Sequence, residues 1–369
     1  MKRAAAAAIS LMTGLAMLTG CSRAEVEETI QPLVADAIEE SDSEAEAVKE
    51  EDESPLIPEI DTDVKIHAGS RIAVVSKCVK GEYWKMVKKG MEDAVKEINN
   101  AYGYKKDDQI TMTFEGPDNE EDVETQINTI DAVIAENPDV LCISASDMDS
   151  CEAQLEAAKE NGIPVIAFDS NVAEKKLVRA YRGTDNVQVG KMAAYQLGSA
   201  LGKMGKVAVF SAQQKTKSVQ DRVEGFMNNI GKYGDIEVVE TIYSDQVDDM
   251  EASMKEVLEK YPTLDGVFCT NADITEMYLE LDKGDVKDAP ALVGVDATTK
   301  QQEAIRNGEE IGCVSQQSYA MGYQTIWAAV ETTAPKKSVT IEKELLLNPA
   351  WIDAENLDDP DSSAYLYAE

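Results

Sequence analysis

Three polar residues stand directly after short apolar runs that have the composition of β-strands. Asp169 follows Pro-Val-Ile-Ala-Phe, Asn271 follows Gly-Val-Phe-Cys-Thr, and Asp296 follows Ala-Leu-Val-Gly-Val. Carboxylate and amide groups offer the paired donors and acceptors that match the vicinal hydroxyls of a polyol. Any single strand-end Asp is equally well explained as a helix cap, so the prediction of a polyol site depends on the recurrence of the pattern. It recurs, after other such runs, at Ser76 with Lys77, Asp147 and Gln316.

An arginine and two aromatic residues complete the candidates. Arg222 lies at the start of a helix predicted over residues 220–230 and supplies a planar, charge-assisted donor fork. Tyr83 and Trp84 begin the helix after the first strand, and flat aromatic faces suit the apolar C–H faces of a sugar ring. Core packing is the alternative for both rings. Because Trp84 also falls on the apolar stripe of its helix, we expect one ring to pack and the other to meet ligand.

Strands and helices alternate along the part of the chain that holds these residues. Apolar, β-branched runs are separated by segments of helical period, which predicts parallel sheets with helices on both faces. About ten strands are too many for one open sheet, so we predict two sheets. Ligands of such sheets bind outside the carboxyl ends of the strands, in a cleft between the two. The predicted strands cover residues 71–76, 110–115, 140–144, 164–168, 206–210, 236–243, 266–269, 291–295 and 311–315.

The N-terminus has the pattern of an export signal. Lys2 and Arg3 precede an uncharged stretch over residues 4–18, which is too short for a stable membrane span and is typical of a signal peptide over residues 1–20. The stretch ends Leu-Thr-Gly-Cys21, which resembles a bacterial lipobox. The resemblance implies a lipid on Cys21 that anchors the chain at the outer face of the cell membrane. An ordinary signal peptide with a chance cysteine is the alternative.

Composition excludes some partners and separates a tether from the folded part. The formal net charge of −35 makes nucleic acid a poor partner, because phosphate would be repelled. Residues 24–63 carry sixteen Asp or Glu and one Lys, so the segment cannot bury enough apolar surface to fold alone. We therefore predict a disordered acidic tether over residues 21–66.

Five cysteines remain besides Cys21, and their spacing favours buried small hydrophobic side chains over disulfides or a metal site. Three of them lie inside strand-like runs, and the number is odd. We predict neither a metal nor a cofactor. The five are Cys78, Cys142, Cys151, Cys269 and Cys313.

Six motifs, in order, give residues 71 to about 347 a resemblance to the sugar-binding proteins of ABC importers, in the ribose-binding branch of the periplasmic-binding-protein family. The resemblance depends on the order and spacing of the motifs together. They are Gly81-Glu82-Tyr83-Trp84, the Pro-Val-Ile strand ending at Asp169, Arg222-Val-Glu-Gly-Phe226, Phe268-Cys-Thr-Asn271, Val293-Gly-Val-Asp296 and Gln316.

The resemblance implies an α/β fold of the type 1 periplasmic binding proteins, with two Rossmann-like lobes joined by a three-segment hinge. Lobes of residues 70–184 plus 317–344 and of residues 185–316 plus 345–358 would close on a sugar, with crossings at Asp185 and Asn186, at Gln317 and near residues 344–345. It further implies a monomer that delivers the sugar to a permease with its ATPase. The implied ligand contacts are Tyr83, Trp84, Asp169, Arg222, Asn271, Asp296 and Gln316, with Ser76, Lys77, Asp147 and Gln246 as secondary contacts.

Three departures from the family pattern make ribose itself doubtful as the ligand. Gly81 and Glu82 replace an Asn-Pro pair, Ser170 stands where ribose binders carry Arg, and Gln246 replaces an aromatic residue. Because buried polar groups reject ligands that leave them unpaired, we expect a different ligand. A larger hexose, a phosphate-free polyol and a sugar-like signal molecule remain open.

Two other functions compete with import. Asp169 and Asp296 could in principle form the carboxylate pair of a glycoside hydrolase, although the sequence has no nucleophile elbow, phosphate loop or Cys/His pair, and we predict no catalytic residue. A subunit that presents ligand to a membrane receptor or kinase would share the same core. A signal peptide in place of a DNA-binding helix-turn-helix excludes a repressor.

Overall fold

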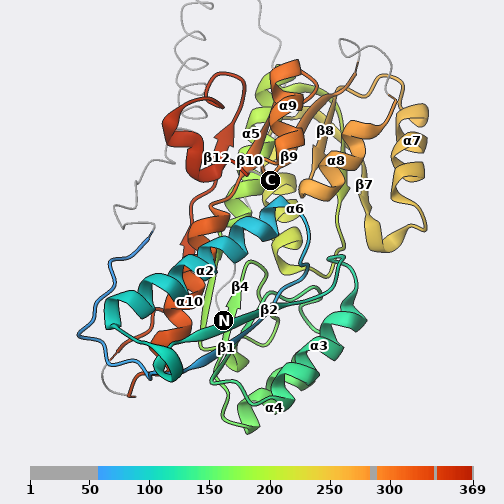
Figure 1. Cartoon of the computed structure of the whole chain (residues 1–369). Coiled ribbons are helices and arrows are strands. Elements are labelled where there is room, and N and C mark those ends of the chain that lie inside the picture. Colours follow the sequence, from blue (N-terminus) through green and yellow to red (C-terminus); the bar gives the residue numbers. More distant parts are fainter. Residues whose placement is uncertain (1–56, 283–288, 336–338, 368–369) are drawn as a thin grey trace, which may run out of the picture. The chain divides into compact units, whose positions relative to one another are not determined.

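The computed structural model describes residues 57–282, 289–335 and 339–367. The predicted signal peptide, Cys21 and the tether up to residue 56 lie outside these residues. Within them, two six-stranded sheets each carry helices on both faces (Figure 1), which confirms the predicted α/β class and the division into two sheets. No described helix combines the length and hydrophobicity needed to cross a membrane.

The first sheet has the order β11-β5-β4-β3-β1-β2, and all of its strands are parallel. With α2, α3, α4 and α10 it forms what we call the first lobe. Its strands are β1 (Arg71–Val75), β2 (Thr111–Glu115), β3 (Val140–Ile143), β4 (Val165–Phe168), β5 (Ala180–Thr184) and β11 (Glu344–Leu347). Its helices are α2 (Glu82–Tyr102), α3 (Val123–Ala135), α4 (Glu152–Glu160) and α10 (Ser318–Thr332).

The second sheet has the order β12-β10-β9-β8-β6-β7, with only β12 antiparallel. With α5 to α9 it forms the second lobe. Its strands are β6 (Met204–Ser211), β7 (Asp235–Tyr243), β8 (Gly266–Cys269), β9 (Ala291–Val295), β10 (Gly312–Ser315) and β12 (Ala350–Ile352). Its helices are α5 (Asn186–Ala200), α6 (Lys217–Ile230), α7 (Met250–Lys260), α8 (Ala272–Glu280) and α9 (Thr299–Asn307).

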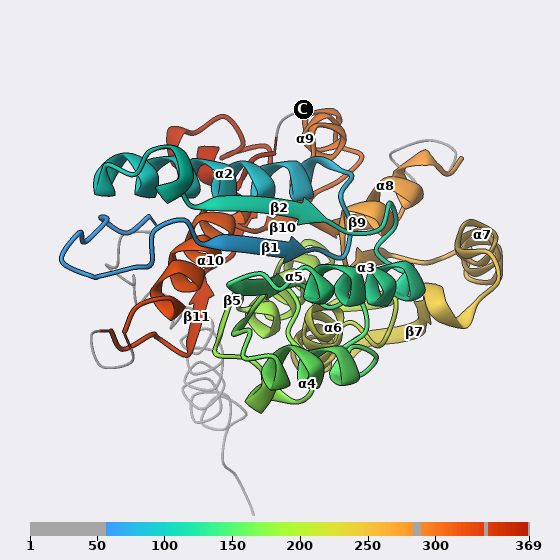
Figure 2. The same ribbon diagram turned by 60° about the horizontal axis from the view of Figure 1, so that its bottom comes forward.

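Each sheet separates two apolar clusters. In the first lobe, α2 and α10 cover one face, and α3 with α4 covers the other, as Figure 2 shows around β1. In the second lobe the corresponding pairs are α5 with α6 and α7 with α8. All five cysteines of the described chain are buried, which agrees with their predicted role as small core side chains.

The predicted tether boundary is wrong at its C-terminal end. Ile60 and Val64 pack against the core of the first lobe, and Ile66 is buried there. The Tyr102 hydroxyl donates to the backbone carbonyl of Val64 at 2.7 Å. Acidic neighbours hid this pattern of apolar residues, so the folded part begins before residue 66.

The third predicted crossing, near residues 344–345, is also wrong by a few residues. Leu345 pairs with Arg182 and Leu347 with Thr184, so β11 still belongs to the first sheet. The chain reaches the second sheet at β12, after residues 348–349. The strand-like composition of residues 344–347 gave no information about which sheet they join.

Three strands were absent from the prediction: β5, β11 and β12. All five residues of β5 are buried, yet its sequence Ala-Tyr-Arg-Gly-Thr is not an apolar run. Arg182 is accommodated there because its Nη1 donates to the carbonyl oxygens of Tyr181 and Glu342, at 2.9 and 3.0 Å. Tertiary hydrogen bonds thus allow a charged residue in an inner strand.

A buried glutamate in the second lobe leads to a stability prediction. Glu310 is 1% exposed; its Oε1 accepts from Gln301 Nε2, and its Oε2 has no partner among the described residues. Burial raises the pKa of Glu310 well above its ordinary value. The pKa of Glu310 is higher in the folded protein than in the unfolded chain, so ionisation of this side chain lowers the free energy of unfolding. That loss is absent below about pH 4.3 and grows as pH rises.

We therefore expect Glu310→Gln to raise the free energy of unfolding by about 1–3 kcal/mol at pH 7. Urea unfolding at pH 7 and pH 4.5 measures the gain, which should shrink at the lower pH. Glu309→Gln, at the exposed neighbouring carboxylate, is the matched control and should change little. An equal gain at both pH values would contradict the titration argument.

Candidate binding cleft

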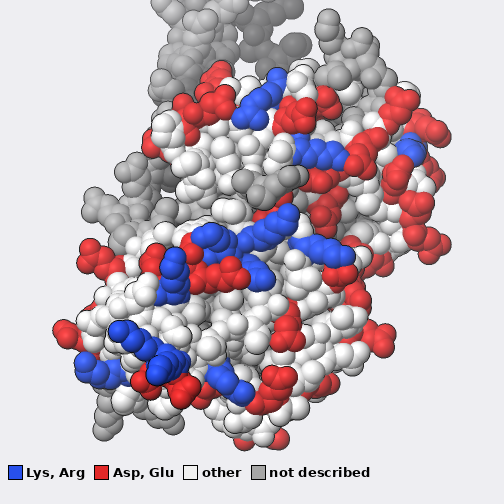
Figure 3. All heavy atoms as spheres, in the orientation of Figure 1, with Lys and Arg blue, Asp and Glu red and all other residues white. Residues whose placement is uncertain are grey.

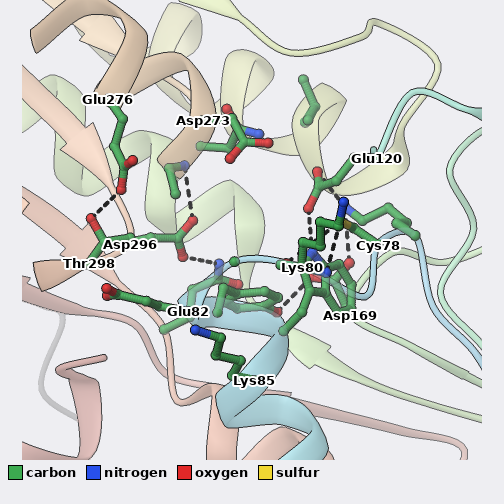
Figure 4. Close-up of a pocket in the computed structure, with 18 of the residues that line it drawn as sticks. Cys78, Lys80, Glu82, Lys85, Glu120, Asp169, Asp273, Glu276, Asp296 and Thr298 are labelled. Atoms are coloured by element: carbon green, nitrogen blue, oxygen red, sulfur yellow. Dashed lines mark hydrogen bonds and ion pairs between the residues drawn. The ribbon is translucent and has the colours of Figure 1, made fainter. Parts of the chain in front are cut away.

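A cavity of about 330 Å³ lies between the carboxyl ends of the two sheets. The first lobe contributes the residues after β1, the start of α2, the loop after β2 and the residue after β4. The second lobe contributes α6, the start of α8 and the residues after β9 and β10. All seven residues predicted as ligand contacts line this cavity, together with Lys77. Figure 4 shows part of the lining.

Three predicted secondary residues lie outside the cavity lining. The Ser76 hydroxyl donates to the Cys78 carbonyl oxygen at 2.7 Å. Asp147 accepts from the backbone N–H groups of Asp149 and Ser150 in a local turn. Gln246 is exposed and donates to Gln214. Asp147 also pairs with Lys215 of the second lobe at 3.6 Å, so each of these side chains is engaged by other protein groups outside the cavity lining.

Asp169 is the centre of a buried network in the first lobe. Its carboxylate accepts from the Tyr83 hydroxyl at 2.7 Å and the Ser144 hydroxyl at 2.8 Å, and Lys77 Nζ lies 3.1 Å away. Burial alone would raise the pKa of Asp169, but Lys77, the Tyr83 hydrogen bond and Arg222 hold it below its ordinary value. The site therefore presents Asp169 as a carboxylate.

Asp296 has the corresponding place in the second lobe. One carboxylate oxygen accepts from Gln316 Nε2 at 2.7 Å and the Tyr367 hydroxyl at 3.0 Å, and the other accepts from the Ala272 N–H at 3.2 Å. Burial raises the pKa of Asp296, and Arg222 opposes that shift. Asp296 is thus a buried acceptor whose charge depends on neighbouring donors.

Both aspartates adopt left-handed backbone conformations, with φ of 54° at Asp169 and 78° at Asp296. This region is unfavourable for most side chains, but Asp and Asn tolerate it better than others. Strain of this kind concentrates at functional sites, where the surrounding structure holds it in place. At each of these two aspartates the backbone therefore turns away from the direction of the preceding strand, beside the cleft.

Arg222 is held by two hydrogen bonds and is 3% exposed. Its Nε donates to Asn186 Oδ1 and its Nη1 to the Thr270 carbonyl oxygen, both at 2.8 Å. The bond between Arg222 and Asn186 requires α6 and α5 to lie close together. Gly190 of α5 permits this approach, because a Cβ there would lie 1.9 Å from the Arg222 carbonyl oxygen. The remaining amino group, Nη2, has no hydrogen-bond partner in the described chain and is available for a ligand.

The aromatic residues form one wall of the cavity. The rings of Tyr83 and Trp84 lie perpendicular, with centroids 5.0 Å apart. Both line the cavity, and both also belong to the core of the first lobe. Trp84 Nε1 donates to Glu120 at 2.7 Å. The Tyr367 ring lies 5.7 Å from that of Tyr83.

Sequence reasoning missed several residues of the cleft. Glu120 follows β2 and Asp273 and Glu276 begin α8, so the strand-end rule and an i, i+3 spacing could have indicated all three. Tyr367 gave no such signal, because it follows no strand and reaches Asp296 from the C-terminal segment just after a 3-10 helix over Pro360–Tyr365. Asn271 is both a helix cap, accepting from the Ile274 N–H at 3.1 Å, and a lining residue.

Contacts between the lobes surround the cavity. Glu82 Oε2 accepts from the Thr299 N–H at 2.7 Å, and the Ser146 carbonyl oxygen accepts from the Thr216 hydroxyl at 2.6 Å. A third contact joins the Ser244 hydroxyl to Glu121. The lobes therefore touch on more than one side of the cavity, so a small molecule inside would contact both.

The residues at the crossings also interact. Asp185 caps α5 by accepting from the Gln188 N–H at 2.9 Å, and Asn186 holds Arg222. Gln317 Nε2 donates to the Asn348 carbonyl oxygen at 2.9 Å, which joins the second crossing to the third.

Comparisons with known proteins place these features in context. A family model described as a periplasmic binding protein domain matches residues 72–337. The ribose import binding protein of Bacillus subtilis is 26% identical over 220 residues, which are 60% of this chain and 71% of that protein. The xylitol-binding protein of Mycolicibacterium smegmatis is 25% identical over 211 residues, 57% of this chain and 60% of that protein. An ABC transporter solute-binding protein from Agrobacterium vitis, solved with bound D-fucose, superposes with a TM-score of 0.72 and 26% identity, and covers 81% of this chain and 100% of its own.

Proposed function

Because the chain belongs to the periplasmic binding protein family, we propose that it captures a sugar or sugar-like polyol in the cavity between its lobes and delivers it to the permease of an ABC importer. The Agrobacterium vitis relative is described as an ABC transporter protein with bound D-fucose. The Bacillus subtilis relative is described as a ribose import protein. These descriptions support a sugar as the class of ligand.

The observation that carries the proposal is the composition of the cavity lining. Carboxylates from both lobes, the free Nη2 of Arg222 and the amides of Asn271 and Gln316 converge there beside aromatic rings. Hydroxyls of a sugar satisfy such groups, and the rings cover its apolar faces. A ligand that contacts both lobes stabilises the arrangement in which they touch, with motion at the three crossings.

The same proposal gives the N-terminus a role. A lipid on Cys21 and the acidic segment after it would hold the binding lobes near the permease at the extracytoplasmic face of the membrane. On the face drawn in Figure 3, Asp and Glu predominate toward α7 and basic side chains gather near the middle. A surface of this kind supports recognition of a partner by complementary charge.

Thermal unfolding in the presence of single sugars tests the proposal. Ribose, xylitol, D-fucose, the common hexoses and the hexosamines form the panel. A ligand at one hundred times its dissociation constant should add about 2.7 kcal/mol of stability, which raises the melting temperature by several degrees. The double variant Asp169→Asn/Asp296→Asn is the control and should lose the shift. If no sugar in the panel raises the melting temperature, the proposal fails.

A further inference from the structure

The cavity lining carries more negative than positive groups. Seven carboxylate side chains and four cationic ones line it. A site for a neutral sugar needs no such excess, because hydroxyls are satisfied by paired donors and acceptors of either kind. The carboxylates that have no cationic partner in this lining therefore indicate which chemical groups the ligand carries.

Two of the three first-lobe cations that line the cavity pair with carboxylates of the first lobe, and the third, Lys85, has no ion pair with any described residue. Lys77 Nζ lies 3.1 Å from Asp169 and 3.6 Å from Glu120. Lys80 pairs with Asp118 at 2.6 Å at the rim. None of these three lysines forms an ion pair with Asp273, Glu276 or Asp296 among the described residues.

The uncompensated charge lies on the second lobe. Figure 4 shows Asp273, Glu276 and Asp296 on one side of the cavity, from α8 and the residues after β9. Asp273 has no hydrogen bond or ion pair with any described residue, and it is exposed to the cavity that it lines. Among the residues that the structure describes, Glu276 accepts only from the Thr298 hydroxyl, at 2.6 Å. Among the second-lobe lining residues, Arg222 is the one cation.

A buried acceptor next to these carboxylates lacks a donor. Gln316 lines the cavity and is 2% exposed. Its Nε2 donates to Asp296, while its Oε1 has no hydrogen-bond partner within the described chain. Buried polar atoms are almost always paired, so this oxygen indicates a donor that the ligand supplies.

We propose that the ligand carries a protonated amino group, as an amino sugar or an amino polyol does, and that Asp273 and Glu276 bind the ammonium while Gln316 Oε1 accepts from a neighbouring donor. The inference rests on the proposed function, because it specifies the class of sugar for the same cavity. An ammonium offers three donors and no acceptor, which fits a wall of acceptors.

The titration of Asp273 supports this reading. Partial desolvation in the cavity wall and the nearby carboxylates Glu120, Glu276 and Asp296 raise the pKa of Asp273 to about 7, and Lys77 opposes the shift. A bound cation would lower that pKa again, so binding near neutral pH releases a proton from Asp273. A neutral sugar has no such effect.

Calorimetric titration at pH 7 with matched pairs tests the inference. The probes are D-glucosamine, D-galactosamine and D-mannosamine, each against its parent hexose. A charge-assisted contact predicts that at least one amino sugar binds about tenfold or more tightly than its parent. Parent hexoses that bind as tightly as every amino sugar would overturn the inference and leave the proposed function intact. Absence of binding by any sugar, amino or neutral, would instead remove the proposed function.

Two variants test whether Asp273 binds the ammonium group of the ligand. Asp273→Asn should reduce the ratio of amino-sugar to parent-sugar affinity about tenfold. Glu280→Gln removes a carboxylate from the same helix outside the cavity lining and should leave that ratio unchanged. An unchanged ratio in Asp273→Asn would remove Asp273 from the ammonium site.

Discussion

Asp296→Asn is expected to weaken sugar binding by roughly 100-fold, the equivalent of the charge-assisted hydrogen bonds that the carboxylate makes to ligand hydroxyls. Asp296 lies in the second lobe at the end of β9, where it is buried and aligned by Gln316 and Tyr367. An amide keeps the shape and one acceptor but loses the charge. Titration calorimetry with the tightest sugar of the panel measures the change.

Asn is the informative substitution because of the backbone. At a φ of 78°, Ala would add strain that Asn avoids. The unliganded variant should therefore melt within a few degrees of the parent protein and show the same circular dichroism spectrum. Affinity within threefold of the parent in a folded Asp296→Asn protein would show that this carboxylate does not contact the ligand.

Lys77→Met is expected to lower the free energy of unfolding by about 3–5 kcal/mol at pH 7, because it leaves a buried carboxylate without its cation. Lys77 and Asp169 side chains are 5% and 3% exposed. Burial lowers the pKa of Lys77, but Asp169 and Glu120 together raise it, so the lysine is charged in the folded protein. Urea unfolding measures the loss.

The pH dependence of that loss identifies its cause. In the parent protein the lowered pKa of Asp169 adds stability above about pH 4, which is lost as pH falls through the folded pKa. Without Lys77 that contribution shrinks or reverses, so the difference between the two proteins should be larger at pH 7 than at pH 4. A constant difference would indicate lost packing. Lys88→Met, at an exposed pair with Glu92, is the control and should cost less than about 1 kcal/mol.

Much of the cleft could be predicted from the sequence because parallel strands direct their carboxyl ends to one edge. Asp169, Asn271, Asp296 and Gln316 follow strands that are mainly apolar, so both the strand and its end were visible. Arg222 was found through its helix and its chemistry. The resemblance to the family then supplied the pairing of the two lobes, which no local pattern contains.

The missing parts depend on contacts between segments far apart in the chain. The inner strand β5 contains Arg182, whose burial is possible only because carbonyl oxygens of its own strand and of residue 342 accept from it. Tyr367 reaches Asp296 from outside every helix and strand. The C-terminal end of the predicted tether was placed too late in the sequence, because the acidic composition of the segment obscured the apolar residues Ile60, Val64 and Ile66.

The exchange of segments between the lobes has a consequence for how the chain folds. The first sheet lacks the strand β11, and one of its faces lacks α10, until the chain has passed through the first five strands of the second lobe, β6 to β10; the second sheet in turn lacks β12 until β11 is complete. Pairing over such sequence distances raises contact order and slows folding. Neither half of the chain can therefore become a finished domain early, and the two lobes should acquire their cores in one late, cooperative step. A chain with that property stays unfolded longer after synthesis, which is the state that a protein needs for export through a narrow channel.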